Sequence, residues 1–125
     1  MIGFYYIGIQ IYYFLILCAA LFNPKARLWI KGRKKLFARI ESQLNSKEKT
    51  IWFHCASLGE FEQGRPLIEA FKKNYPEYKI LLTFYSPSGY EIRKNYEHAD
   101  YVFYLPLDTL GNASKFLDLV NPVLI

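Results

Sequence analysis

Charge is missing from the first part of this sequence. Residues 1–22 contain no Asp, Glu, Lys, Arg or His, and Gln10 is their only strongly polar side chain. A run of about 20 apolar residues is long enough to cross the hydrocarbon core of a bilayer as a helix. Because the run is apolar on all sides, we expect it to span the membrane rather than to lie in the interface. A secretory signal peptide would carry basic residues before its apolar part, and this sequence has none there.

Cysteine is scarce, with Cys18 in the apolar run and Cys55 after a predicted strand. That separation argues against a disulfide between them, and so few cysteines suit a reducing compartment. Neither the cysteines nor the two histidines have the spacing of metal ligands. The sequence therefore predicts no disulfide, no metal site and no cofactor.

Acidic residues are few between residues 23 and 50, where nine Lys and Arg stand against two Glu and give a charge of +7. Residues 51–125 carry −2, so the overall charge of +5 is concentrated next to the apolar run. This placement favours an anionic membrane surface or a phosphorylated lipid as partner, and it argues against nucleic acid. Basic residues on this flank also predict that the rest of the chain lies in the cytoplasm.

The basic segment has the pattern of an amphipathic helix. Asn23 and Pro24 end the apolar helix, since a residue before proline avoids helical geometry. Residues 26–44 repeat apolar side chains at helical spacing, with an interruption expected at Gly32, and residues 42–50 are expected to be a linker. Four of the cations form what we call the basic collar: Lys31, Arg33, Lys34 and Lys35. Two interpretations stay open, the first favoured: the basic collar holds the chain against anionic lipid, or it also binds the phosphates of a lipid acceptor.

The remainder of the chain alternates between strand and helix patterns. Strands are expected at residues 51–54, 79–84, 101–104 and 123–125, and helices at 60–74, 90–96 and 108–120. This alternation predicts an α/β fold with a Rossmann-like parallel sheet and helices on both faces. The chain thus divides into a membrane-anchor helix (1–22), a basic juxtamembrane segment with its linker (23–50) and a Rossmann-like domain (51–125). Because the sequence stops inside an apolar strand, which needs neighbours, we expect it to be truncated.

In a parallel sheet, the working residues follow the carboxyl ends of the strands. Three loops have that position here: HCASLGE at residues 54–60, TFYSPSG at 83–89 and YLPLD at 104–108. Hydroxyls and free N–H groups at a helix start suit an anion, so Ser86, Ser88 and Gly89 are candidates for substrate binding. A turn at residues 86–89 with a helix cap at Ser88 explains the same residues equally well.

HCASLGE, SPSG and YLPLD, in this order and spacing across residues 51–125, resemble the Kdo (3-deoxy-D-manno-octulosonic acid) transferase family. The apolar N-terminus with its basic collar fits the same family. The resemblance implies a GT-B glycosyltransferase, in which two Rossmann-like domains face each other across a cleft. It implies inverting transfer of Kdo from CMP-Kdo to a lipid A precursor in lipopolysaccharide biosynthesis, without a metal, at the cytoplasmic face of the inner membrane. It covers only the acceptor-side half, so this chain alone, without a donor-binding domain, is expected to be inactive.

The resemblance also implies that Glu60 acts as a general base. Sugar transfer with inversion needs a base that takes the proton from the attacking hydroxyl, on the face opposite the leaving group. Gly59 would let the backbone approach the substrate, and Gly59 and Ser57 are both assigned to substrate binding. From spacing alone, residues 57–60 are a capping box that satisfies two N–H groups at a helix start. The cap is the favoured interpretation until the resemblance is considered.

Other polar residues near the loops are expected to have structural roles. His54 is predicted to be a hydrogen-bonded strand-end residue, Asp108 a helix N-cap, and Arg65 part of a solvated helix face. A second function stays open beside the enzyme: a non-catalytic, membrane-anchored module that holds anionic lipid with the basic collar and the SPSG loop. Such a module would keep binding lipid after Glu60→Gln and would lose it when the basic collar is neutralised.

Overall fold

The computed structural model describes residues 1–45 and 47–125, which form helices on both sides of a short sheet. The helices are α1 (Ile2–Ala19), α2 (Pro24–Arg33), α3 (Leu36–Gln43), α4 (Leu58–Asn74), α5 (Pro87–Arg93) and α6 (Leu110–Val120). The strands are β1 (Thr50–Cys55), β2 (Lys79–Phe84) and β3 (Tyr101–Tyr104). Within the linker expected over residues 42–50, position 46 lies outside the described residues.

The strands form a parallel sheet in the order β1-β2-β3, with β2 in the centre and buried on both faces. The last residues of the chain add to the open edge of β1. Leu124 forms a bridge with Ile51, and the amide of Trp52 donates to the Leu124 carbonyl at 2.9 Å. A fourth segment beside the first strand is the order in which a doubly wound sheet begins. The predicted parallel α/β fold is confirmed, and the expected fourth strand is present as a single bridge.

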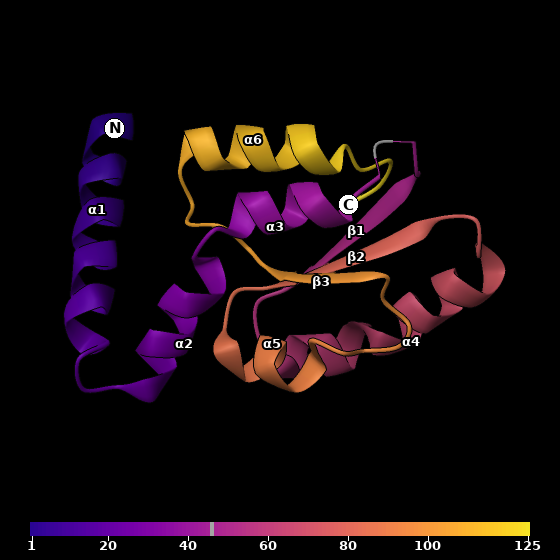
Figure 1. Ribbon diagram of the computed structural model, residues 1–125, viewed down its shortest axis with the longest axis horizontal. Coiled ribbons are helices and arrows are strands. Elements are labelled where there is room, and N and C mark those ends of the chain that lie inside the picture. The colour runs from indigo at the N-terminus through magenta and orange to yellow at the C-terminus, as the bar shows by residue number, and fades with distance from the viewer. Residues whose placement is uncertain (46) are drawn as a thin grey trace.

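Each face of the sheet is covered by two helices, as Figure 1 shows. On one face, α4 and α5 pack on side chains that include Leu82 and Phe84. On the other face, α3 and α6 pack on Leu81 and Phe103. Neighbouring residues of a strand point to opposite faces, which explains why the apolar run of β2 supplies both cores. The helix α3, which the sequence placed in the basic segment, is therefore part of the core of the α/β fold.

The interruption of the basic segment lies between α2 and α3, at Lys34 and Lys35. Lys35 has a φ of 55°, the left-handed conformation that ends helical geometry. The expected position, Gly32, is wrong by two residues, because Gly32 remains inside α2. A Cβ atom at Gly32 would lie 2.0 Å from Cε2 of Tyr104, so the glycine is needed for α2 to pack against the end of β3.

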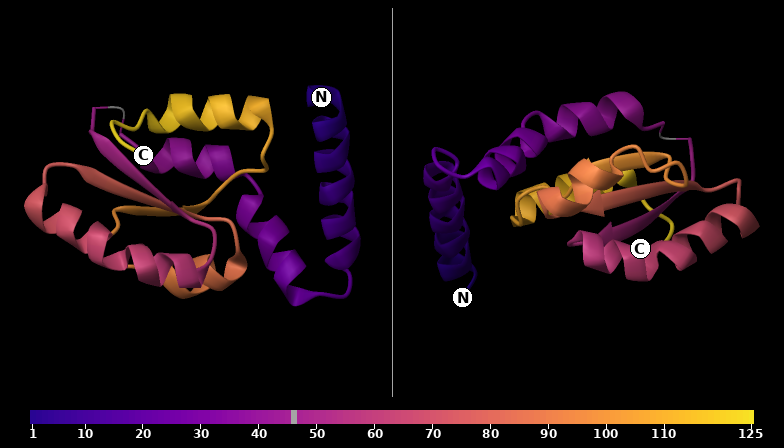
Figure 2. Two further views of the ribbon diagram at one scale, coloured as in Figure 1. Left: turned by 180° about the vertical axis from the view of Figure 1, so that it is seen from behind. Right: turned by 90° about the horizontal axis from the view of Figure 1, so that it is seen from below.

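The helices α1 and α2 form a hairpin beside the edge of the sheet where the strands end, and α1 stands at the side of the molecule (Figures 1 and 2). Asn23 begins α2, because its side chain accepts a hydrogen bond from the amide of Lys25 at 2.9 Å and Pro24 occupies the first helical position. Within the described residues, α1 is a helix long and apolar enough to cross a membrane, and none of its residues is buried.

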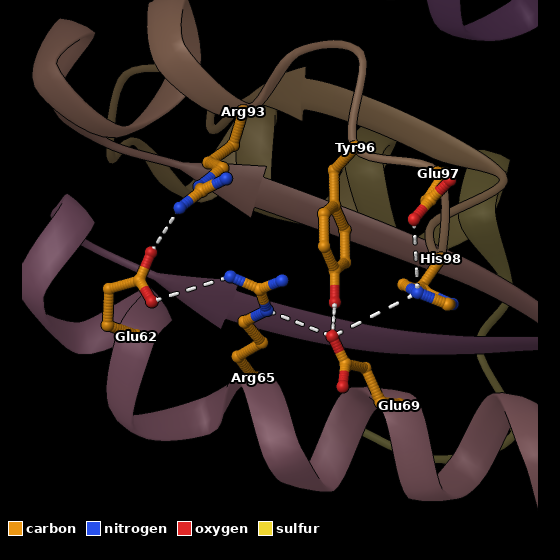
Figure 3. Close-up of polar contacts among 7 residues, drawn as sticks. All are labelled: Glu62, Arg65, Glu69, Arg93, Tyr96, Glu97 and His98. Atoms are coloured by element: carbon orange, nitrogen blue, oxygen red, sulfur yellow. Dashed lines mark hydrogen bonds and ion pairs between the residues drawn. The ribbon is translucent and has the colours of Figure 1, made fainter.

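A polar network joins α4 to α5 and the segment that follows α5 (Figure 3). Arg65 lies between two carboxylates of its own helix, 3.8 Å from Glu62 and 2.9 Å from Glu69. Glu62 also accepts from Arg93 at 2.5 Å, and Glu69 accepts from the hydroxyl of Tyr96 at 2.9 Å. Arg65 is therefore on a helix surface, as predicted, where its partners are carboxylates of the fold.

Candidate active site

Hydrogen bonds between backbones bring the three predicted loops together at the carboxyl edge of the sheet. The amide of Ser86 donates to the carbonyl of Ala56 at 2.9 Å, which joins the HCASLGE loop to the SPSG loop. The amide of Leu105 donates to the carbonyl of Phe84 at 2.8 Å, which joins the YLPLD loop to the end of β2. Parallel pairing places all three strand ends at one edge, and this edge is where sheets of this kind bind ligands.

Glu60 lies in the first turn of α4 and is exposed. The hydroxyl of Ser57 accepts from the amide of Glu60 at 3.4 Å, and the Glu60 carboxylate accepts from the amide of Ala56 at 2.6 Å. This is the reciprocal arrangement of a capping box, except that the carboxylate reaches the residue before the N-cap. A Cβ at Gly59 would meet only the Ser57 hydroxyl, at 3.9 Å, so the surface beside Glu60 is open.

His54 lies near the end of β1, and both His54 and Trp52 are hydrogen-bonded to the side-chain hydroxyl of Thr83. The indole of Trp52 donates to Thr83 Oγ1 at 2.9 Å, and Nδ1 of His54 lies 2.9 Å from the same oxygen. Burial lowers the pKa of His54, and the Glu60 carboxylate acts in the opposite direction. His54 is thus a hydrogen-bonded strand-end residue, as predicted, and it lies within the electrostatic reach of Glu60. The sequence placed Thr83 in the TFYSPSG loop without a role, and the structure places its hydroxyl between Trp52 and His54.

The SPSG segment differs from its prediction. Ser86 is the N-cap, because its hydroxyl accepts from the amide of Ser88 at 3.2 Å, and α5 begins at Pro87. The predicted turn and the cap at Ser88 are therefore wrong, since proline suits the first helical position and its φ continues into a helix. Gly89 is buried, and a Cβ there would lie 2.3 Å from Phe84 Cδ1, so it serves the packing of α5 on β2. Binding of substrate by Ser86, Ser88 and Gly89 stays a prediction.

The N-cap of α6 also differs from its prediction. The hydroxyl of Thr109 accepts from the amide of Asn112 at 3.2 Å, so Thr109 is the cap. Asp108 lies one residue too early, and its carboxylate instead accepts from the hydroxyl of Tyr5 on α1.

Arg33, one member of the basic collar, is enclosed by aromatic rings. Its guanidinium lies 3.8 Å from the ring centroid of Trp29, 4.9 Å from that of Tyr85 and 5.0 Å from that of Tyr104. It donates to the carbonyls of Trp29 at 3.2 Å and Tyr85 at 2.9 Å. Burial lowers the pKa of Arg33 to about 10. These three rings, which we call the Arg33 cage, fasten α2 to the ends of β2 and β3.

The other three members of the basic collar, Lys31, Lys34 and Lys35, are exposed. The structure therefore separates residues that the sequence treated as one group: Arg33 lies against the residue before the SPSG loop, and the lysines face solvent. Trp29 and Arg33 are four residues apart on a helix, which is the one sequence signal that could have indicated their contact. The rings from the strand ends could not be assigned without the fold.

An open pocket of about 260 Å³ lies between the helix hairpin and the SPSG loop. Its lining comes from α1, α2 and the loop: Tyr12, Ile16, Lys25, Ala26, Trp29, Tyr85, Ser86 and Pro87. The lining combines apolar side chains with the ammonium group of Lys25 and residues that carry hydroxyl groups, which suits a ligand that has both an apolar and an anionic part.

Among residues 1–45 and 47–125, no group of three or more His, Cys, Asp or Glu side chains is placed to hold a metal ion. Cys18 is exposed on α1, and Cys55 is buried at the end of β1, where burial raises the pKa of its thiol.

Comparison with known proteins gives a consistent result. The model of the family described as 3-deoxy-D-manno-octulosonic-acid transferase (kdotransferase) matches residues 31–125. Proteins named 3-deoxy-D-manno-octulosonic acid transferase are similar: that of Haemophilus influenzae is 32% identical over 75 residues and that of Aquifex aeolicus 34% over 90 residues. The protein of that name from Chlamydia trachomatis serovar D is 35% identical over 79 residues.

These matches cover 59%, 71% and 62% of the chain but only 18%, 24% and 17% of the three relatives, so the chain spans less than a quarter of their length. No solved structure matches the chain.

Proposed function

The chain belongs to the 3-deoxy-D-manno-octulosonic-acid transferase family, whose model matches residues 31–125, and on that premise we propose that it is the acceptor-binding part of a glycosyltransferase of lipopolysaccharide biosynthesis. The reaction we propose is inverting transfer of Kdo from CMP-Kdo to a lipid A precursor. One structural observation supports it most directly. The three loops that carry the family resemblance meet at the carboxyl edge of one parallel sheet, where such folds bind ligands.

We assign the donor to a second Rossmann-like domain outside residues 1–125, in a GT-B arrangement. The chain spans less than a quarter of the relatives, which leaves room for such a domain in proteins of their length. We therefore expect the chain alone not to transfer Kdo. No step of this assignment requires a metal or a cofactor, because CMP is a good leaving group and the residues of the site supply proton transfer and binding.

Glu60 is the general base in this proposal. Its carboxylate is exposed at the carboxyl edge and lies beside Gly59, where the surface is open to an approaching hydroxyl. It takes the proton of the attacking acceptor hydroxyl while the bond between Kdo and CMP breaks on the opposite face. Its hydrogen bond from the amide of Ala56 holds the side chain at the loop, so capping and catalysis use the same orientation.

The acceptor is held between the helix hairpin and the loops. Ser57, Ser86 and Ser88 present hydroxyl groups at the carboxyl edge, and Lys25 and Ser86 line the pocket beside α1. A lipid A precursor has acyl chains and phosphates, which correspond to the apolar walls and to the cations of this region. The exposed lysines of the basic collar lie at the end of α2 and add positive charge on the same side of the fold.

Attachment to the inner membrane, with the α/β fold on the cytoplasmic face, completes the proposal. It is supported by the apolar α1 and by the basic residues that follow it. The substrates agree with this location, because a lipid acceptor is itself a membrane component.

The deciding experiment measures transfer of labelled Kdo from CMP-Kdo to a lipid A precursor by the full-length protein. Three forms are compared: wild type, Glu60→Gln and Glu62→Gln. Glu62 lies on the same helix and is also exposed, but it pairs with Arg65 and Arg93, so its loss removes charge without touching the loop. We expect Glu60→Gln to lower the rate by at least about 100-fold, as removal of a general base does, and Glu62→Gln to have little effect. Equal rates for all three would reduce Glu60 to a helix cap, and no transfer by folded wild type would exclude the enzyme.

A second candidate is the lipid-binding module without catalysis, favoured by the exposed lysines beside an apolar helix. It predicts undiminished binding of anionic vesicles by Glu60→Gln together with no transfer by wild type. Measured on the same preparations, vesicle binding and transfer distinguish the two functions.

A further inference from the structure

Four tyrosines of α1, between residues 5 and 13, contact α2 and the α/β fold. The Tyr5 hydroxyl donates to the Asp108 carboxylate, and the Tyr6 hydroxyl accepts from the amide of Leu110 at 3.2 Å. Further along α1, the hydroxyl of Tyr12 is hydrogen-bonded to that of Tyr85. The rings of Tyr12 and Tyr13 lie 6.3 Å and 6.1 Å from the ring of Trp29. The contacts reach from Leu110 at the start of α6 to Tyr85, the residue before the SPSG loop.

The sequence of α1 separates two faces of the helix. Tyr5, Tyr6, Tyr12 and Tyr13 are spaced at i, i+1, i+7 and i+8, which places all four on one side of a helix with 3.6 residues per turn. The half-buried residues Ile9 and Ile16 fall on the same side. The opposite side is apolar and exposed, with Phe4, Ile7, Ile11, Phe14, Leu15 and Cys18, and Gln10 lies at its border.

These contacts argue against a membrane-spanning α1. A spanning helix would carry Tyr5 and Tyr6 to the far side of the hydrocarbon core, about 30 Å away from the cytoplasmic side. Asp108 and Leu110 belong to the loop and helix that follow β3, on the same fold as Glu60. They cannot contact residues on the other side of a bilayer. The 18 residues of α1 measure about 27 Å, which is at the lower limit for crossing.

We propose that α1 lies in the plane of the membrane, docked on the α/β fold by its tyrosine side and inserted into an anionic lipid surface by its opposite side. This inference rests on the membrane attachment proposed above and replaces spanning as the geometry of that attachment. Apolar side chains of such a helix enter the boundary between headgroups and acyl chains. The exposed cations Lys25 and Arg27 follow α1 directly and match the charge of anionic headgroups.

The geometry has a consequence for the acceptor. The pocket beside the SPSG loop is lined by Tyr12 and Ile16 of α1, so an in-plane α1 places this pocket at the lipid surface. A lipid acceptor can then reach the carboxyl edge of the sheet while its acyl chains stay in the bilayer. A spanning α1 would withdraw the same wall of the pocket.

The test maps the side of the membrane on which the start of α1 lies. The full-length protein is prepared with its own cysteines replaced and with a single cysteine at Ile2, or at Ser114 on the exposed side of α6 as the cytoplasmic reference. A membrane-impermeant maleimide is applied to spheroplasts and to inverted membrane vesicles. We expect neither cysteine to react in spheroplasts. Reaction of Ile2→Cys in spheroplasts, with Ser114→Cys protected, would overturn the proposal and leave the transferase function untouched.

A crosslink supplies the positive measurement. Ile2 and Ala113 line the same cavity between α1 and α6. The double variant Ile2→Cys with Ala113→Cys is treated with a short bifunctional maleimide in native membranes, and we expect an intramolecular crosslink. Its absence would overturn the docking of α1. Recovery of the protein in the soluble fraction instead would refute the membrane attachment on which this inference rests, whereas the transferase function is tested separately by Kdo transfer.

Removal of the hydroxyls tests the cause of docking. Replacing Tyr5, Tyr6 and Tyr12 by Phe in the crosslinking background keeps the rings and removes the hydrogen bonds, and we expect the ratio of docked to undocked α1 to fall on the order of 10-fold. Tyr13→Phe is the control, because Tyr13 contacts Trp29 through its ring. Equal crosslinking in the triple variant and the control would contradict the role of the hydroxyls.

Discussion

Glu60 has a structural role as a helix cap, and the substitution Glu60→Gln can preserve that role. Its carboxylate accepts from the amide of Ala56, and the carboxamide oxygen of Gln can accept the same hydrogen bond. We therefore expect Glu60→Gln to change the free energy of unfolding by less than about 0.5 kcal/mol, and Glu60→Ala, which removes the cap, to lower it by about 1 kcal/mol. Urea denaturation checks this. If Gln is as destabilising as Ala, the cap depends on the charge, and the loss of transfer by Glu60→Gln could no longer be assigned to chemistry.

Two glycines offer a matched pair for the packing of α2. A Cβ at Gly32 would lie 2.0 Å from the fully buried ring of Tyr104, and a Cβ at Gly111 would meet nothing within 4 Å. Tyr104 cannot move aside, because its ring packs against that of Tyr90 with the ring centroids 4.1 Å apart. We expect Gly32→Ala to destabilise the fold by about 1–3 kcal/mol. Gly111→Ala should be neutral or up to about 1 kcal/mol stabilising, since alanine favours a helix. Thermal unfolding compares them, and equal midpoints would show that α2 is not packed on β3.

The raised pKa of Tyr96 makes the stability of the fold depend on pH at high pH. Burial, followed by the hydrogen bond to Glu69, raises the pKa of Tyr96 to about 12, whereas an unperturbed tyrosine has a pKa of about 10. The folded state thus favours the neutral hydroxyl, so this contribution is complete below about pH 10 and is lost as the pH rises through about 12. Tyr96→Phe keeps the buried ring and cannot ionise. We expect its melting temperature to fall less steeply than that of wild type across this window, with exposed Tyr75→Phe as the control. Parallel curves for wild type and Tyr96→Phe would contradict the assignment.

At the scale of elements, α3 is the part of the basic segment that belongs to the core. Ile40 is fully buried against the sheet, and its neighbour Glu41 is exposed. We expect Ile40→Ala to lower the free energy of unfolding by about 2–5 kcal/mol, because it leaves a cavity, and Glu41→Ala to change it by less than about 0.5 kcal/mol. Chemical denaturation of the two variants measures both changes in the free energy of unfolding. A small effect of Ile40→Ala would mean that α3 is a linker outside the folded core.

The elements that sequence reasoning predicted well are those whose signal is local. Buried strands appear as short apolar runs, so the expected strand at 79–84 matches β2 to the residue, and the helix expected at 60–74 differs from α4 only at its start. Caps were harder, because several Ser, Thr and Asp residues compete for one position. Thr109 takes the cap expected at Asp108, since one residue of register decides which hydroxyl reaches the free amide.

What the sequence could not supply is the identity of partners distant along the chain. The capping role of Glu60 was predicted because Ser57 is three residues away. The Arg33 cage was not, because two of its three rings come from the ends of β2 and β3. The spacing of the α1 tyrosines is visible in the sequence, but their partners, among them Asp108 and Tyr85, are not, because these lie far along the chain.

At the scale of the whole molecule, the anchor and the candidate site are one assembly. The hairpin of α1 and α2 lies beside the edge of the sheet where the three loops meet, and the Arg33 cage fixes the position of α2. A cation held by aromatic rings and carbonyl groups is not available to lipid, so the basic collar has one structural member and three exposed ones. The two groups should respond differently to neutralisation.

We therefore expect replacement of Lys31, Lys34 and Lys35 by Gln to weaken binding to anionic vesicles on the order of 100-fold at low salt, at about 1 kcal/mol for each lysine, without changing the melting temperature. The control replaces Lys47, Lys49 and Lys73 by Gln. These lysines are exposed near the opposite, amino edge of the sheet, and their replacement removes the same amount of charge. Arg33→Gln should instead lower the melting temperature, because it empties the cage. Flotation at low and high ionic strength measures the binding, since screening weakens only the electrostatic part. Equal losses in both lysine variants would show that net charge, and not the position of the basic collar at the carboxyl edge, attracts the lipid.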